Sequence, residues 1–228
     1  MEQNYLRKAK DIAITLLDIP VEIEDLGMVR HPIFSSSVVV FPDEEQRFGD
    51  LSDKATLKKA IQQRKELIEE SDSLESLTYL ITKPYRMQFL ELIENTLPQS
   101  EFAVSLSRIW IDMENPNTCG VSLHTLIEWF KRADKSSLMD DEELEAFEAL
   151  PDEFTVYRGM GDKSNEKGIS YTLSLEKAQW FANRPPSERG YVLTGTAKKD
   201  DVLAFFTRRS EQEILIEPEN VSDLHRME

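Results

Sequence analysis

The sequence predicts an α+β fold, and two changes along the chain support this prediction. Between Ser52 and Leu150, apolar residues recur at the three- and four-residue spacing of amphipathic helices. After Pro151 the spacing changes to the alternation of strands, with one helical segment among them. At 228 residues, 40% of them hydrophobic, the chain is long and apolar enough to bury a core, as one large domain or two small ones.

Local start signals divide the helical region into segments. Asp53, Ser100 and Ser122 are suitable N-caps, because a short polar side chain there can accept a hydrogen bond from the first turn. The charged face of the last helix, over residues 140–148, is interpreted as solvated surface. We therefore expect helices over residues 2–18, from 52 to 63 and beyond, over 74–81 and 86–95, and in segments that open at 100, at 122 and at 140 or 141.

The segment from His31 to Glu44 has a centre of β-branched residues flanked by prolines, which predicts a strand or an extended arm. Its three serines, 35–37, are interpreted as a solvated turn, because neither a glycine elbow nor a nearby base accompanies them. The loop 115–120 is dense in turn-forming residues.

Strands are expected over residues 155–158, 191–196, 202–206 and 214–216, with a helix over 175–182. This pattern divides the chain into an N-terminal extension of unknown role (1–50), a helical lobe (51–150) and a β-rich core (151–228). The connection at residues 150–152 is too short to let two domains move freely. Residues 51–228 are therefore expected to form one domain.

The chain is strongly acidic, with a formal charge of −16 from 43 acidic and 27 basic residues. Such a surface repels nucleic-acid backbones and anionic membranes, so direct binding to either is not expected. The charge suits solubility, a basic protein partner or imitation of nucleic-acid charge. An acidic surface with no partner is the simplest interpretation.

Cys119 is the only cysteine, so an intrachain disulfide is impossible and a reducing compartment is expected. Because only three histidines accompany it, a zinc site of histidine and cysteine ligands is not expected. The N-terminus lacks a secretory pattern, and no stretch approaches the roughly 18 apolar residues of a membrane span. We therefore expect a cytoplasmic protein.

Two glutamates, Glu211 and Glu213, stand at the start of the last predicted strand. Residues i and i+2 of a strand share a face, so both carboxylates should point the same way while Gln212 faces the core. Carboxylates so placed repel each other unless they meet solvent, a cation or a ligand. Arg158 should likewise project from an apolar strand face and need a carboxylate or phosphate partner. A structural Arg–Glu ion pair is the alternative to a ligand site.

These residues resemble the ADP-ribosyltransferases of the Arg-Ser-Glu class, which are related to bacterial toxins and arginine-modifying ectoenzymes. That class has an Arg on its first core strand, a Ser-Thr-Ser-like triplet on the next, and a Glu-x-Glu motif before a late strand. The helical lead-in over residues 138–159 resembles phage-encoded members from Gram-positive bacteria. The motifs cover only residues 150–216, and the matching segments are Tyr157-Arg158-Gly159, Ser170-Tyr171-Thr172 and Glu211-Gln212-Glu213.

The resemblance implies an N-terminal helical lobe packed on a split β-sheet core, with an NAD cleft. NAD would be a substrate, and no metal would be required. Arg158 would hold a phosphate oxygen of NAD, and the backbone of Gly159 would approach the nicotinamide amide. Phe181 falls at the position of the family's nicotinamide-stacking aromatic residue, and Arg184 at that of a phosphate-binding arginine.

The resemblance also implies the catalytic roles. Ser170 would position the catalytic carboxylate of Glu213, which stabilises positive charge on the ribose, and Thr172 would support the cleft. Glu211 would orient and deprotonate the incoming nucleophile. In the family, a glutamate at that first position accompanies transfer to arginine.

Several of these residues also have a purely structural interpretation. Ser174 directly precedes the predicted helix and is interpreted as its N-cap. Phe181 fits ordinary helix core almost as well as it fits stacking on nicotinamide. Arg208 and Arg209 are possible substrate contacts, but solvated loop charges are the better default. Tyr171 stands where the family usually has Thr, and a ring there would narrow the cleft.

The first functional hypothesis is a mono-ADP-ribosyltransferase whose acceptor is an arginine of a protein. In a phage context the acceptor would be a host protein and the location the host bacterial cytoplasm. The second is an acidic protein of the same fold that binds a basic host factor without catalysis. An NAD glycohydrolase, with water as nucleophile, would use the same residues as the transferase.

Overall fold

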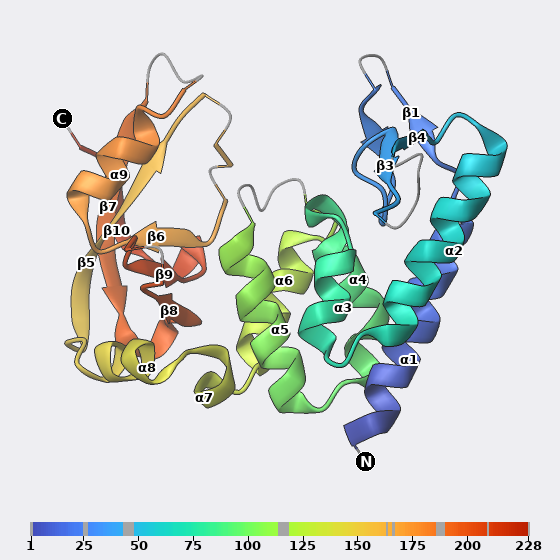
Figure 1. Ribbon diagram of the computed structural model, residues 1–228. Helices are drawn as coiled ribbons and strands as arrows, with labels where there is room; N and C mark the ends of the chain where they lie inside the picture. The colour runs from blue at the N-terminus through green and yellow to red at the C-terminus, as the bar shows by residue number, and fades with distance from the viewer. Residues whose placement is uncertain are drawn as a thin grey trace. The chain divides into compact units, whose positions relative to one another are not determined.

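The computed structural model describes residues 2–24, 27–42, 48–113, 119–162, 164–165, 167–185, 190–208 and 210–227. These residues form two compact units (Figure 1). Unit 1 comprises Met1–Pro98 with Thr118–Gly120, and unit 2 comprises Gln99–Asn117 with Val121–Glu228. Helices dominate unit 1, whereas unit 2 combines helices with a six-stranded antiparallel sheet. The predicted α+β class is confirmed.

The helices of unit 1 begin where the local signals predict. Asp53 accepts a hydrogen bond from the backbone N–H of Thr56 at 2.8 Å and so caps the second helix. Ser73 and Ser76 form a reciprocal capping box at the third. The helical elements are α1 (Glu2–Thr15), η1 (Leu16–Asp18), α2 (Lys54–Glu70), α3 (Leu74–Leu80), η3 (Lys83–Tyr85), α4 (Arg86–Ile93) and η4 (Glu94–Thr96).

Two small antiparallel hairpins complete the described part of unit 1. Strand β1 (Glu22–Ile23) pairs with β2 (Val29–Arg30), and β3 (Val38–Val40) pairs with β4 (Phe48–Asp50). The extended segment predicted over 31–44 is therefore a strand only in its valine centre, and its last residues, 43 and 44, lie outside the described residues. The serines predicted as a solvated turn do not form one: Ser36 makes an antiparallel bridge to Met28, and its Oγ accepts from the Val38 N–H at 3.1 Å.

Residues 31–34, at the beginning of the predicted extended segment, are not a strand, because two of their backbone N–H groups donate to the side chain of His31. The N–H groups of Ile33 and Phe34 both donate to His31 Nδ1, at 3.0 and 3.3 Å, so neither can pair with a strand. Nε2 of the same ring bonds the Ile19 carbonyl at 3.0 Å, which requires the proton on Nε2. His31 is 1% exposed, and burial lowers its pKa, opposed by the hydrogen bond to Ile19.

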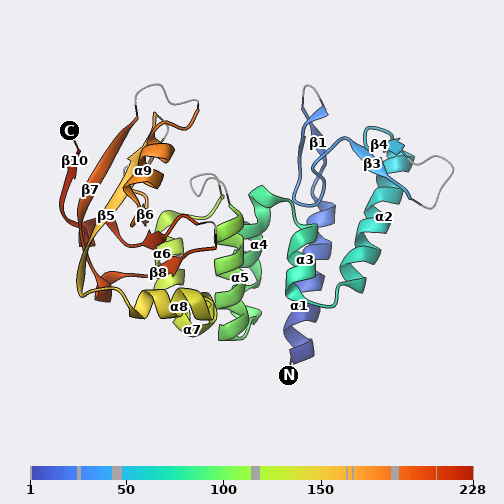
Figure 2. The same ribbon diagram turned by 60° about the vertical axis from the view of Figure 1, so that its left-hand side comes forward.

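The sheet of unit 2 has the strand order β10-β7-β5-β6-β9-β8, and its neighbouring strands are antiparallel (Figure 2). The four strands predicted from alternation are confirmed, and β6 is the strand that the resemblance implied. The sixth strand, β10, was not predicted, because all five of its residues are exposed and its sequence shows no alternation. The strands are β5 (Glu153–Met160), β6 (Ser170–Thr172), β7 (Tyr191–Lys198), β8 (Ala204–Phe206), β9 (Glu213–Leu215) and β10 (Ser222–Arg226).

The helices of unit 2 lie around this sheet, and α9 packs on β5 and β7 (Figure 1). Ser122 and Asp140 cap their helices as predicted. The predicted cap at Ser100 is wrong: the helix begins directly after Pro98, so Ser100 lies in its first turn. The helices are α5 (Gln99–Asp112), α6 (Leu123–Arg132), α7 (Lys135–Leu138), α8 (Asp141–Glu148) and α9 (Leu175–Ala182), with η6 (Lys199–Asp201) and η7 (Pro218–Asn220).

The composition change at Pro151 marks a change of element type inside unit 2. Helices and sheet share one core there, as the ring of Phe130 from α6 packs 6.5 Å from that of Phe206 on β8. The boundary between the units instead falls after Pro98, within the segment 51–150 that was expected to form one lobe. Of the predicted turn at 115–120, residues 115–118 lie outside the described part, and Gly120 has the positive φ of a turn, +75°.

None of the helices in the described part of the chain is both long enough and apolar enough to cross a membrane.

The buried histidine predicts a pH-dependent stability. The folded-state pKa of His31 lies below the ordinary value of 6.5, so the unfolded chain takes up the proton first as the pH falls. The neutral His31 ring therefore makes its full contribution to the free energy of unfolding above about pH 6.5. This contribution is lost as the pH falls below that value. His31→Gln should reduce the difference in unfolding temperature between about pH 7.5 and about pH 5.5. An unchanged difference would contradict this assignment.

Candidate functional site

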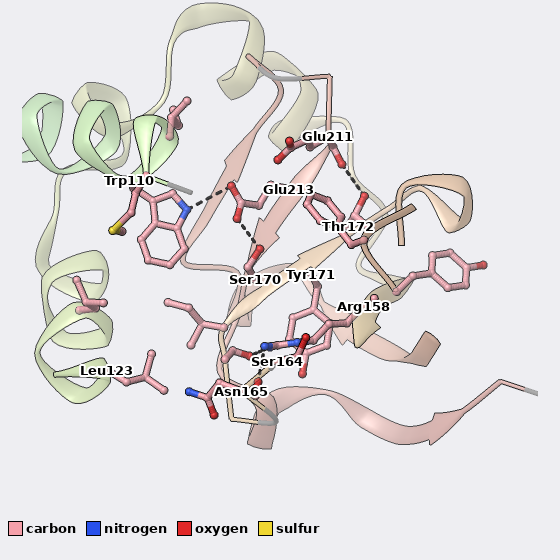
Figure 3. A pocket seen from close by; sticks show the side chains of 18 of the residues that line it. Trp110, Leu123, Arg158, Ser164, Asn165, Ser170, Tyr171, Thr172, Glu211 and Glu213 are labelled. Carbon is pink, nitrogen blue, oxygen red and sulfur yellow. Dashed lines mark hydrogen bonds between the residues drawn. The ribbon is translucent and has the colours of Figure 1, made fainter. Parts of the chain in front are cut away.

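Unit 2 contains a cavity of about 630 Å³, with α5 and α6 on one side and the sheet on the other (Figure 3). The remaining walls come from residues 164, 165, 168 and 169 after β5, from α9, and from the turn before β9. All the site residues predicted from the sequence line this cavity: Arg158, Gly159, Ser170, Thr172, Phe181, Arg184, Glu211 and Glu213.

The pairing of β6 with β9 brings Ser170 and Glu213 together. Thr172 lies opposite Glu213 in this pair, and Ser170 lies opposite Leu215. Ser170 Oγ donates a hydrogen bond of 2.5 Å to Glu213 Oε1 across 43 residues of sequence. The other oxygen, Oε2, accepts from the indole Nε1 of Trp110 at 3.2 Å. Glu213 is half-buried, so its carboxylate faces the cavity with both oxygens engaged.

Glu211 lines the same cavity, but its backbone conformation differs from the strand that the alternating sequence pattern predicted. Strand β9 begins only at Glu213, and Gln212 has a left-handed backbone with φ +47°. The prediction that Glu211 and Glu213 share a strand face, with Gln212 in the core, is therefore wrong: Gln212 is exposed. A positive φ in a residue other than glycine is strained, so the surrounding contacts must stabilise this turn.

Thr172 provides one of these contacts. Its Oγ1 donates a 2.5 Å hydrogen bond to the Glu211 carbonyl and accepts from the Ser174 N–H at 3.0 Å. The Leu173 N–H also donates to the Gln212 carbonyl, at 3.1 Å. The triplet strand therefore fixes both the carboxylate of Glu213 and the turn that carries Glu211.

Arg158 binds backbone carbonyls. Its guanidinium donates to the Asn165 carbonyl at 2.5 Å and to the Gly168 carbonyl. A Cβ at Gly168 would overlap the guanidinium, so a larger residue there would require the end of the Arg158 side chain to shift. Burial lowers the pKa of Arg158, with the nearby Tyr171 and Tyr191 acting in the opposite direction.

Among the described residues no carboxylate lies within ion-pair distance of Arg158, so the alternative of a structural ion pair finds no support there. Carbonyl dipoles compensate its charge only in part. A half-buried guanidinium at a cavity wall, with no ion-pair partner in the described part of the chain, is suited to an anionic ligand.

Gly159 is needed first of all for helix packing. A Cβ there would overlap the Ala178 carbonyl and the Ala182 nitrogen of α9. Ser174 caps this helix by accepting from the Lys177 N–H at 3.3 Å, as predicted. Close approach of a ligand to the Gly159 backbone is compatible with its place in the cavity wall but is not needed to explain this glycine.

The aromatic and basic residues at the end of α9 form one edge of the cavity. Phe181 is half-buried and contacts Trp180 edge-on at 5.0 Å, whereas the core face of α9 consists of Ala178 and Ala182. Arg184 is exposed, with its guanidinium 5.5 Å from the Trp180 ring. Residues 186–189, which follow in the same loop, lie outside the described part.

Tyr171 lies beside Arg158, with the guanidinium 5.5 Å from its ring centroid. The side chain is 2% exposed, and its hydroxyl has no hydrogen-bond partner among the described residues. Burial raises the pKa of this phenol, and the charge of Arg158 opposes the rise. The ring does line the cavity, as expected for a bulky residue at this place in the triplet.

Trp110 is the residue of this site that sequence reasoning missed. Its spacing with Phe102 and Leu106 predicted a core position, and it is indeed 4% exposed. The one indication in the sequence was the residue type, because the N–H of a buried indole needs a hydrogen-bond acceptor. Periodicity alone does not indicate that the acceptor is Glu213.

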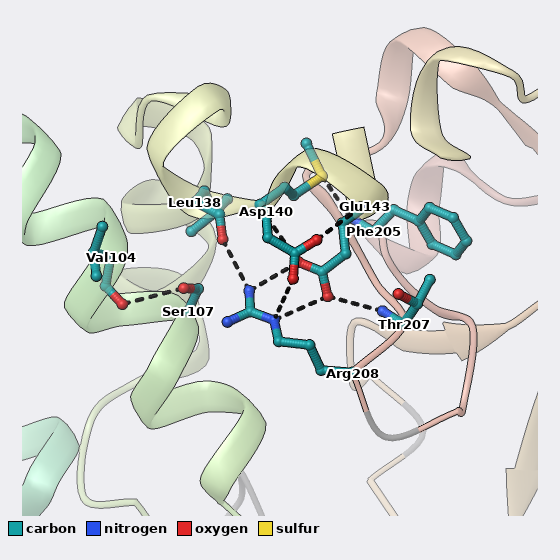
Figure 4. A network of polar contacts seen from close by, with 9 residues as sticks. Val104, Ser107, Leu138, Asp140, Glu143, Phe205, Thr207 and Arg208 are labelled. Atoms are coloured by element: carbon teal, nitrogen blue, oxygen red, sulfur yellow. Dashed lines mark hydrogen bonds and ion pairs between the residues drawn. The ribbon is translucent and has the colours of Figure 1, made fainter. Parts of the chain in front are cut away.

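An ion pair between Arg208 and the buried carboxylate of Glu143 anchors the loop before β9 (Figure 4). Glu143 is 0% exposed and accepts from Arg208 Nε at 3.0 Å, from Arg208 Nη2 at 2.8 Å and from the Thr207 N–H at 2.9 Å. It also completes the capping box of α8 with Asp140. The charges of 140–148 are thus not all solvated surface, and Arg208 is an exposed loop residue whose charge is paired with Glu143. Arg209 lies outside the described residues.

No protein-family model, no curated protein and no solved structure matches this chain. Within the described residues, no group of three or more His, Cys, Asp or Glu side chains is arranged to hold a metal ion. The function must therefore be inferred from the chemistry of the cavity.

Because the buried Glu143 carboxylate accepts charge-assisted hydrogen bonds from Arg208, Glu143→Gln should destabilise the protein by about 2 kcal/mol, although Arg208 keeps a 3.5 Å contact with Asp140. Glu145→Gln is the matched control on the exposed face of the same helix and should change stability by less than about 0.5 kcal/mol. Urea unfolding of the two variants measures the difference. Equal effects would show that the Glu143–Arg208 pair does not anchor the loop.

Proposed function

We propose that the chain is an NAD-dependent mono-ADP-ribosyltransferase, which cleaves the bond between nicotinamide and ribose and transfers ADP-ribose to an acceptor. The main support is the 2.5 Å hydrogen bond between Ser170 and Glu213 in a cavity that Arg158 and Glu211 also line. These four side chains are the ones that resemble the Arg-Ser-Glu pattern. The split sheet around an NAD cleft, implied by the same resemblance, belongs to this proposal.

The cavity suits a ligand of this kind. Its volume of about 630 Å³ lies within the range of small-molecule sites. Its walls combine a carboxylate, a guanidinium and an aromatic ring, which match the ribose, the phosphates and the nicotinamide of NAD. In this proposal Arg158 binds a phosphate oxygen, Phe181 packs on the nicotinamide ring and Arg184 contributes a second cation at the rim.

Glu213 acts on the ribose. When the glycosidic bond breaks, its electron pair leaves with nicotinamide, which becomes neutral, and positive charge develops on the ribose. A carboxylate already oriented by two donors stabilises that charge without having to reorganise. Ser170 contributes through Glu213 by fixing the orientation of its carboxylate.

Glu211 acts on the acceptor. A nitrogen of an arginine side chain forms the new bond to the ribose carbon, and its proton passes to the Glu211 carboxylate, which acts as general base. The left-handed turn at Gln212 brings Glu211 to the cavity beside Glu213. With water in place of arginine, the same step would hydrolyse NAD.

Glu213→Gln tests the proposal, because it keeps the size of the side chain and removes the charge. Nicotinamide release from NAD, measured with a guanidino compound present as acceptor, should fall by roughly a hundredfold or more. Glu176→Gln on the exposed side of α9 is the matched control and should release nicotinamide at the wild-type rate.

If wild type and Glu213→Gln both fail to release nicotinamide, and wild type does not bind NAD in calorimetry, the proposal is wrong. The acidic surface would then make a non-catalytic binding protein the leading hypothesis. Release without modification of the acceptor would identify a glycohydrolase.

Arg158→Lys tests the anion contact. A lysine keeps the charge, but it lacks the planar set of donors that reaches the carbonyls and a ligand together. The Kd for ADP-ribose should therefore rise about tenfold, the value of a lost charge-assisted hydrogen bond. An unchanged Kd in calorimetry, with the variant as stable as wild type, would exclude Arg158 from the binding site.

A further inference from the structure

The Glu213 carboxylate is held by donors from two different elements. Ser170 Oγ on the neighbouring strand donates to Oε1 at 2.5 Å, and Trp110 Nε1 on α5 donates to Oε2 at 3.2 Å (Figure 3). A carboxylate held at one oxygen can still rotate about its last torsion angle, which is broad in glutamate. With both oxygens engaged, that rotation is restricted.

Trp110 is itself held in place by aromatic packing. Its ring meets that of Phe130 edge-on at 5.2 Å, and the ring of Phe130 lies 6.5 Å from that of Phe206. Phe206 is the β8 residue directly opposite Glu213 in the sheet. The chain Trp110–Phe130–Phe206 thus links the indole back to the strand that carries the carboxylate.

The polar contact of Trp110 is not needed for packing. A phenylalanine would fill the same edge-on position against Phe130, whereas a tryptophan adds one buried N–H that must find an acceptor. Here the acceptor is the carboxylate that lines the cavity. The ring of Trp110 also lines the cavity, so the contact lies at its wall.

We infer that Trp110 is a positioning residue for the proposed reaction: it fixes the orientation of the Glu213 carboxylate from the helical side, while Ser170 fixes it from the sheet. What Glu213 does once oriented rests on the proposed function. The hydrogen bond itself does not, so it can be tested separately.

The first experiment is a double-mutant cycle on thermal unfolding, with Trp110→Phe, Glu213→Leu and the double variant. Trp110→Phe should lower the unfolding temperature by about 3 °C more in the wild-type background than in the Glu213→Leu background, because only the former contains the hydrogen bond. Equal shifts in the two backgrounds overturn the inference, whether or not the protein turns over NAD.

The second experiment is steady-state kinetics of nicotinamide release by Trp110→Phe. A loss of orientation should lower kcat by roughly tenfold to a hundredfold and leave the KM for NAD unchanged. Trp129→Phe is the matched control: Trp129 is 3% exposed in unit 2 and meets Phe102 edge-on at 5.7 Å, but it has no hydrogen bond to Glu213. Its kcat should be that of wild type.

The two experiments separate the possible failures. Coupling in the cycle together with an unchanged kcat, or a raised KM with kcat unchanged, overturns the positioning role. Equal losses of kcat in Trp110→Phe and Trp129→Phe also overturn the positioning role, because any substitution of a buried tryptophan in unit 2 would then lower kcat. Coupling without any NAD turnover by wild type would confirm the restraint on Glu213 and reject the proposed function.

Discussion

The antiparallel pairing of β6 with β9 is the constraint on which the site depends. It places Ser170 and Thr172 beside Glu213 and gives each hydroxyl a definite partner: the Glu213 carboxylate for Ser170 and the Glu211 carbonyl for Thr172. A slip of one residue in this pairing would turn both hydroxyls to the opposite face of the sheet. The three-residue strand β6 thus determines where both glutamates lie.

The turn before β9 is strained and is held from both ends. Ser210 and Gln212 both have positive φ, 54° and 47°, which are costly for side chains other than glycine. On one side Arg208 is anchored to the buried Glu143, and on the other Thr172 and Leu173 bind the backbone of the turn. A long-range ion pair and a neighbouring strand therefore maintain a conformation that the local sequence alone would not favour.

Features that depend on local sequence were predicted well. Capping by Asp53, Ser122, Asp140 and Ser174 follows from hydrogen bonds within a few residues, and all four are confirmed. The alternation of apolar and polar residues after Pro151 likewise predicted four strands, and the helical segment among them predicted the helix at 175–182. The predicted cap at Ser100 was wrong, because the helix already begins at Gln99.

Features that depend on distant residues were not predictable in the same way. The alternation rule placed Glu211 and Glu213 on one face, because nothing in the spacing reveals the left-handed residue between them. Glu143 looked like one more charge on an acidic helix, although its partner lies 65 residues away. Trp110 looked like core, and its bond to Glu213 spans 103 residues.

The most direct test of the proposed transfer is mass spectrometry of a small guanidino compound incubated with NAD and the wild-type protein. If the chain transfers ADP-ribose, the guanidino compound gains the mass of one ADP-ribosyl group as free nicotinamide accumulates. An unmodified acceptor, with all of the NAD still intact, would contradict the proposed transfer.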